Sequence, residues 1–145
     1  MNVSRSLTTV ALAATAALSV TTLAVTPASA GGAPDLGTVG VDRLASLGTD
    51  GVTVHGTYAC TVPDAAGASG PGTIGVELVS RSGASTSGTV AVTCDGTTRS
   101  WTVTASAVSL RHGQAWLHGY LEVPDAAGNT PWNLFDATVI VVGSR

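Results

Sequence analysis

Residues 52–62 read VTVHGTYACTV, and this stretch decides the fold class of the chain. Its even positions are Val, Val, Gly, Tyr, Cys and Val, whereas its odd positions are Thr, His, Thr, Ala and Thr. Strict alternation of apolar and polar residues is typical of a β-strand with one buried face. The stretch is therefore predicted to be a half-buried strand whose buried face carries Cys60.

The same alternation recurs along the chain. Further strands are expected at residues 38–42, 73–78, 90–94, 101–105, 115–123 and 134–142, which brings the count to seven. No apolar period of 3.6 residues is sustained after residue 30, so no helix longer than about one or two turns is expected there. Seven short strands separated by regular turns predict an all-β chain, folded as an antiparallel immunoglobulin-like β-sandwich.

The N-terminus has the pattern of a cleavable signal peptide. Arg5 precedes an apolar stretch at residues 7–25, and residues 26–30 read TPASA, which ends in the small residues that signal peptidase accepts. A retained transmembrane anchor is the competing interpretation. Cleavage after Ala30 would leave residues 31–145 as one secreted domain.

The charge of the predicted mature chain limits the classes of partner that we expect it to bind. It keeps all nine acidic residues and five of the six arginines, so its net charge is −4 with histidine neutral. The sequence contains no basic cluster, which argues against nucleic acid and, once the signal is removed, against a membrane as a partner.

Cys60 and Cys94 are the two cysteines of the chain. In an exported protein such a pair favours a disulfide, which would add about 3–4 kcal/mol to stability by restricting the unfolded chain. The alternative is a redox or nucleophilic thiol pair. That chemistry usually requires Cys-x-x-Cys spacing or a basic neighbour, and neither is evident in the sequence.

A six-residue motif, VPDAAG, occurs at residues 62–67 and again at 123–128, each time after a strand that contains His-Gly. Proline, aspartate and glycine in this order suit a turn. An internal duplication and the reuse of a favourable strand–turn unit are both consistent with the repeat.

Two resemblances to known families follow from short motifs. Residues 56–60 (GTYAC) and 92–96 (VTCDG), with Trp101 shortly after, resemble a family of small exported actinobacterial domains whose function is uncharacterised. That resemblance implies a β-rich fold and the Cys60–Cys94 disulfide, and it implies no activity. Residues 125–131 (DAAGNTP) more weakly resemble a segment of the neocarzinostatin-like apoproteins, which carry an enediyne chromophore in a cleft. Those apoproteins typically have two disulfides, whereas this chain has cysteines for one.

Catalytic motifs are absent from the sequence, which has no Gly-x-Ser-x-Gly, His-Glu-x-x-His or phosphate-binding glycine loop. Glu77 and Glu122 are expected on the outward faces of different strands, as solvated charges rather than as a carboxylate pair. His55, His112 and His118 would ligate a metal only as a long-range cluster, and exposed histidines are the alternative. We therefore expect no enzymatic activity, no cofactor and no catalytic or metal-binding residues.

One strand carries the candidate binding residues. Trp116, His118 and Tyr120 are expected to project outward together, at about 7 Å between alternate residues. Trp132, in the loop before the last strand, would extend this patch. Exposed rings can stack on sugars or anchor a protein, although cross-strand packing, cover by a loop or a shift in register would give them a structural role instead.

The sequence thus predicts a secreted, non-enzymatic binding or structural module. Its expected ligand is a carbohydrate, a cell-wall component or a protein, recognised through the aromatic strand. The alternative function is that of a small-molecule carrier of the chromophore-binding kind.

Overall fold

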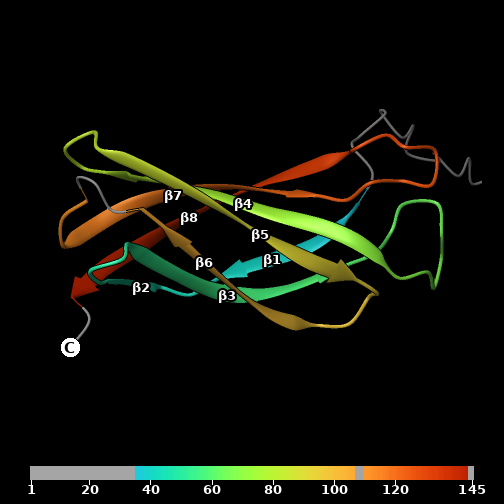
Figure 1. Ribbon diagram of the computed structural model, residues 1–145, viewed down its shortest axis with the longest axis horizontal. Coiled ribbons are helices and arrows are strands. Elements are labelled where there is room, and N and C mark those ends of the chain that lie inside the picture. The colour runs from blue at the N-terminus through green and yellow to red at the C-terminus, as the bar shows by residue number, and fades with distance from the viewer. Residues whose placement is uncertain (1–34, 107–109, 144–145) are drawn as a thin grey trace, which may run out of the picture. The chain divides into compact units, whose positions relative to one another are not determined.

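The computed structural model describes residues 35–106 and 110–143, and these residues form eight β-strands and no helix (Figure 1). The strands belong to one compact unit. They are β1 (Gly37–Val41), β2 (Leu44–Leu47), β3 (Val52–Cys60), β4 (Gly70–Ser80), β5 (Ser85–Cys94), β6 (Arg99–Ala105), β7 (Gly113–Glu122) and β8 (Trp132–Gly143). No helix long and apolar enough to cross a membrane occurs in this part of the chain. The predicted signal peptide, residues 1–30, lies outside the described residues.

All eight strands are hydrogen-bonded into a single mixed sheet. In one half, β3 pairs with β6 on one side and with β1 and β2 on the other. The other half has the order β8-β7-β4-β5 and is antiparallel throughout. Strand β2 joins the halves, because it runs antiparallel to β3 and parallel to β8.

The structure confirms the all-β prediction, but the expected purely antiparallel arrangement is wrong, because β2 and β8 are parallel. The count of seven strands is also too low by one. The unpredicted strand is β2, which has four residues with only Ala45 fully buried. Four residues with one buried side chain are too short to show the alternation that marks the longer strands.

The sheet curls until β5 and β6, two of its edge strands, approach each other (Figure 1). The Thr86 hydroxyl of β5 donates a hydrogen bond to the carbonyl of Ser106, directly after β6. Opposite Val103 of β6 stands Gly88, where an added Cβ would lie 2.7 Å from the valine Cγ1. The two strands therefore meet through side chains along a seam that has no backbone ladder in the described residues.

The concave side of the curled sheet holds the core. Strand β3 alternates between buried and exposed positions along most of its length, as its sequence predicts, with Val52, Val54, Tyr58 and Cys60 buried. Trp101 of β6 is 3% exposed, and its indole Nε1 donates to the Gly40 carbonyl at 3.1 Å. The largest fully buried side chains are Leu36, Ile74, Leu78, Leu117, Leu121, Val52, Val54, Val103, Val123, Val139, Val141 and Cys60.

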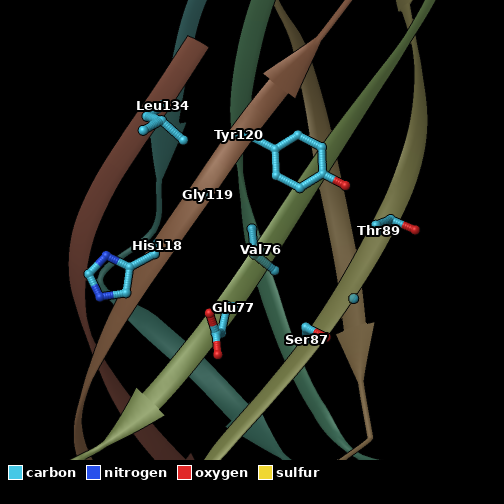
Figure 2. A pocket seen from close by; sticks show the side chains of 9 residues that line it. Val76, Glu77, Ser87, Thr89, His118, Gly119, Tyr120 and Leu134 are labelled. Carbon is cyan, nitrogen blue, oxygen red and sulfur yellow. The ribbon is translucent and has the colours of Figure 1, made fainter. Parts of the chain in front are cut away.

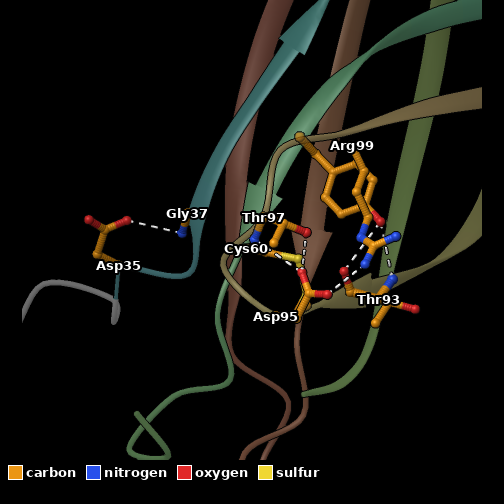
Figure 3. Close-up of a disulfide and its surroundings, with 9 residues drawn as sticks. Asp35, Gly37, Cys60, Thr93, Asp95, Thr97 and Arg99 are labelled. Atoms are coloured by element: carbon orange, nitrogen blue, oxygen red, sulfur yellow. Dashed lines mark hydrogen bonds and ion pairs between the residues drawn. A yellow bond between two sulfur atoms is a disulfide. The ribbon is translucent and has the colours of Figure 1, made fainter. Parts of the chain in front are cut away.

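The predicted disulfide is present between Cys60, the last residue of β3, and Cys94, the last residue of β5 (Figure 3). Both cysteines are buried. Because β3 and β5 share no ladder, the bridge ties the two halves of the sheet together across the core. The Gly96 amide also donates to the Cys60 carbonyl at 2.8 Å, so the turn after β5 is attached to the end of β3.

Asp95 organises that turn (Figure 3). Its Oδ2 accepts a hydrogen bond from Arg99 at 2.6 Å, and its Oδ1 accepts from the hydroxyl and the amide of Thr97 at 2.5 and 3.0 Å. The bond from Arg99, followed by those from Thr97, holds the pKa of the Asp95 carboxyl well below its ordinary value.

The two VPDAAG motifs adopt different conformations. In the second copy Asp125 Oδ1 accepts from the amides of Ala127 and Asn129 at 2.9 and 2.8 Å, and its Oδ2 accepts from the Asn129 side chain at 2.7 Å. These bonds, with that of the Asn129 side chain first, lower the pKa of Asp125. Asn129 directly follows the second copy, whereas Ala68 directly follows the first. In the first copy, Asp64 has a positive φ of 58°. Local turn chemistry therefore depends on the residue after the motif.

Replacing both Cys60 and Cys94 with alanine should lower the free energy of unfolding by about 3–4 kcal/mol, because the unfolded chain loses the closure of a loop of 34 residues. Urea unfolding of the native and double-variant proteins measures the difference. A reducing agent should leave the curve of the double variant unchanged. A loss below about 1 kcal/mol would contradict the role assigned to the bridge.

Asp95→Asn should flatten the acid limb of the stability profile. Because the folded-state pKa of Asp95 lies below its unfolded value, near 3.9, its contribution is complete above that value and is lost as pH falls through the folded pKa. Native stability should thus fall more steeply than that of the variant between about pH 5 and 2. Urea midpoints across this range measure the slopes, with Asp42→Asn as the charge-matched control. Parallel native and D95N profiles would refute the account.

Candidate functional site

Strand β7 presents its aromatic residues outward. Trp116, His118 and Tyr120 alternate with residues of the buried face, as the sequence predicts. Trp116 is 45% exposed, whereas Tyr120 is only partly exposed. Strand β7 pairs with β4 on one side and β8 on the other, so these side chains rise from the middle of the outer surface of this half of the sheet.

Trp132 lies on the same surface, although not in a loop as expected. It is the first residue of β8 and the register partner of Glu122, and it is 55% exposed. The preceding Pro131 has no amide hydrogen, but its carbonyl accepts a hydrogen bond from the Val123 amide at 3.2 Å. Pairing with β7 therefore extends to the end of the loop and makes Trp132 part of the strand.

Leu134 follows Trp132 on the outer side of β8, and it is 70% exposed. It is the register partner of Tyr120. His118 has two register partners, Asp136 on β8 and Glu77 on β4. We use the name aromatic face for the outward residues Glu77, Trp116, His118, Tyr120, Glu122, Trp132, Leu134 and Asp136.

Exposed apolar side chains are concentrated on the outer surface of β2, β7 and β8. Leu44 of β2 is the register partner of Ile140, which shares the outward orientation of Leu134 on β8. Every large apolar side chain that is exposed in residues 35–106 and 110–143 lies on β2, β7 or β8 and points outward: Leu44, Trp116, Trp132, Leu134, Ile140 and Val142.

The outer surface of β3 and β6 has a different composition. Thr53 and Thr104 are joined through their hydroxyls at 3.1 Å, and His55 Nδ1 is hydrogen-bonded to the Thr102 hydroxyl at 3.0 Å. The remaining outward residues of this pair are Thr57 and Ser100. Exposed apolar area is therefore not a general property of the outer surface of this sheet.

A polar row crosses the aromatic face. His118 Nδ1 is hydrogen-bonded to Asp136 Oδ1 at 2.5 Å, and Glu77 stands on the opposite side of the histidine. Ser87 of β5 pairs with Glu77, so the glutamate separates the serine from His118 (Figure 2). The described hydrogen bonds do not join Ser87 to His118, and a serine without an adjacent base is not activated for nucleophilic attack.

Two open hollows flank Tyr120. The ring covers Gly75, since an added Cβ there would lie 2.2 Å from Tyr120 Cε1. On one side, a hollow of about 440 Å³ is lined by Tyr120, Glu77 and His118 among others (Figure 2). On the other side, a smaller hollow of about 310 Å³ is lined by Tyr120, Glu122, Trp132 and Leu134. Each hollow thus combines an aromatic wall with a carboxylate.

The structure separates the predicted histidines. His55 lies on the outer surface of β3, His118 on the aromatic face, and His112 directly before β7. No group of three or more histidine, cysteine, aspartate or glutamate residues in the described ranges is arranged to hold a metal ion.

Glu77 and Glu122 share the aromatic face but do not form a close pair. Thr73 is the partner of Glu122 and precedes Glu77 by four residues on β4, so the two carboxylates stand about 13 Å apart along the strands. Carboxyl groups that cooperate in glycoside hydrolysis are about 5–9.5 Å apart.

Sequence reasoning missed the contribution of β8. The sequence predicted only a strand at residues 134–142, and β8 is central in the hydrogen-bonding order. Its outer side is nevertheless exposed at Leu134 and Ile140. Trp132, Leu134 and Asp136 alternate with Asn133, Phe135 and Ala137, so neither face of β8 is uniformly polar or apolar in the sequence, and no pattern along the chain placed these residues beside β7.

No protein-family model matches the chain, and no curated protein matches it either. The resemblances to the small actinobacterial domains and to the neocarzinostatin-like apoproteins therefore stay predictions.

Proposed function

We propose that this protein is a secreted, non-enzymatic binding module that recognises a carbohydrate chain through the aromatic face. The observation that carries the proposal is the concentration of exposed large apolar side chains on the outer surface of β2, β7 and β8. Contiguous exposed apolar surface on a small domain is a feature of binding sites. The threonine-rich outer surface of β3 and β6 is the internal contrast.

The chemistry of the aromatic face suits sugar rings. The faces of Trp116 and Trp132 can stack on the apolar faces of pyranose rings, and carboxylates and a histidine can accept hydrogen bonds from sugar hydroxyls. Trp116 and Tyr120 stand about 13 Å apart along β7, with Trp132 beyond Tyr120 on β8. This length favours contact with several units of a chain.

The openness of the hollows favours a polymer over an enclosed small molecule. Sites for small ligands bury about 70–90% of the ligand surface. The hollows beside Tyr120 are open depressions on a sheet surface, and Figure 2 shows the larger one. A chromophore carrier, the alternative function, would require a more enclosing cleft.

We further propose that the curled sheet is an immunoglobulin-like sandwich. Strands β1, β3 and β6 would form one layer and β5, β4, β7 and β8 the other, with β2 passing between them. Without β2, the remaining seven strands can be counted in chain order, so that β3 is the second, β6 the fifth and β7 the sixth. Immunoglobulin-like sheets place their second strand beside their fifth, and their sixth beside their third and seventh. The adjacency of β3 to β6, and of β7 to both β4 and β8, therefore supports this arrangement. The disulfide joins β3 to β5, unlike the bridge of antibody domains.

Replacing both Trp116 and Trp132 with alanine should reduce binding to insoluble polysaccharides and purified cell wall at least about tenfold, because each ring supplies stacking area that alanine cannot. Both rings are exposed, so the thermal midpoint should change by only a few degrees. Pull-down assays and thermal unfolding of the purified protein measure the two effects.

The matched control is Thr57→Ala with Thr104→Ala on the outer surface of β3 and β6, which should bind as the native protein does. Retained binding by the tryptophan double variant would refute the proposal. A large fall in the thermal midpoint of the tryptophan double variant would show that the two rings have a structural role. Absence of polysaccharide binding, with capture of an apolar dye by the native protein, would favour the small-molecule carrier.

A further inference from the structure

The aromatic face carries three carboxylates, and its one basic side chain, His118, is hydrogen-bonded to Asp136. The outward positions of β4, β5, β7 and β8 include three carboxylates, those of Glu77, Glu122 and Asp136, and no arginine. The arginines of the described residues lie outside these four strands: Arg43, Arg81, Arg99 and Arg111. Within residues 35–106 and 110–143, neither glutamate has an ion-pair partner.

Each of the two hollows beside Tyr120 is lined by an aromatic ring and a carboxylate. Glu77 stands with Tyr120 in the larger hollow, and Glu122 stands with Tyr120 and Trp132 in the smaller one. Glu122 and Trp132 are direct register partners, so the carboxylate and the indole start from adjacent backbone positions. An aromatic wall beside a carboxylate is a favourable environment for an ammonium group, which the ring attracts through its face and the carboxylate through its charge.

Starting from the proposed recognition of carbohydrate, we infer that the ligand is a polysaccharide with free amino groups, whose protonated amines bind beside Glu77 and Glu122. Charge complementarity selects this ligand over an acidic polysaccharide, which Glu77 and Glu122 would repel. The same repulsion disfavours a second copy of the chain, since two such faces packed about a twofold axis would bring carboxylates together.

The test compares chitosan with chitin, which share a backbone and differ in free or acetylated amino groups. The comparison is made at about pH 5.5, where the chitosan amines are protonated. The purified native protein should bind chitosan at least about tenfold more tightly than chitin, and added salt should weaken only the chitosan interaction.

The decisive variant is Glu77→Gln with Glu122→Gln, which preserves side-chain size and removes two charges from the aromatic face. Its chitosan affinity should fall to the chitin level while its chitin affinity is unchanged. The control, Asp42→Asn with Asp50→Asn, changes the net charge equally at exposed positions outside β4, β5, β7 and β8, and it should retain the chitosan preference.

Three results would overturn the inference. Equal affinity of the native protein for chitosan and chitin, lost in the double tryptophan variant, would refute the amine preference and leave carbohydrate recognition standing. Equal losses of chitosan affinity in the glutamate and aspartate double variants would show that the preference depends only on the net charge of the protein. Binding of neither polysaccharide, with carboxylate-dependent binding of a lysine-rich peptide, would refute both the inference and the proposed function.

Discussion

The register of β7 between β4 and β8 determines which side chains this protein presents to its surroundings. A shift of one residue would exchange the buried and exposed sets of the strand. Two glycines oppose such a shift. An added Cβ at Gly119 would lie 2.2 Å from Phe135 on the inner side, and one at Gly75 would lie 2.2 Å from Tyr120 on the outer side. The packing that fills the core therefore also holds Trp116 outward.

A curled sheet with one core has outer surfaces that can differ in composition. The inner side and the Cys60–Cys94 bridge hold the two halves together. The outer surface of β3 and β6 presents mainly hydroxyls, which water solvates well. The aromatic face instead exposes rings and Leu134, an arrangement that stability alone does not require. Its rigid strands would hold a bound chain without prior ordering of a loop.

The sequence predicted what depends on local alternation. The strands around Cys60 and Trp116, the inward direction of Cys60 and the outward direction of the β7 aromatics all follow from a period of two. It did not predict what depends on pairing between distant segments. The parallel contact of β2 with β8, and the position of Trp132 opposite Glu122, arise from partners far apart in the chain. For the same reason, no pattern along the chain placed His55 and His118 on different surfaces.

The most direct test of the central claim is a ¹H–¹⁵N spectrum of the protein titrated with a soluble glucosamine oligomer. If the aromatic face binds the ligand, the indole signals of Trp116 and Trp132 should shift together with backbone amides of β7 and β8. The indole signal of Trp101, which is buried and bonded to the Gly40 carbonyl, should stay in place. Shifts confined to β3 and β6, or no shift at a ligand concentration that saturates chitosan binding, would contradict the account.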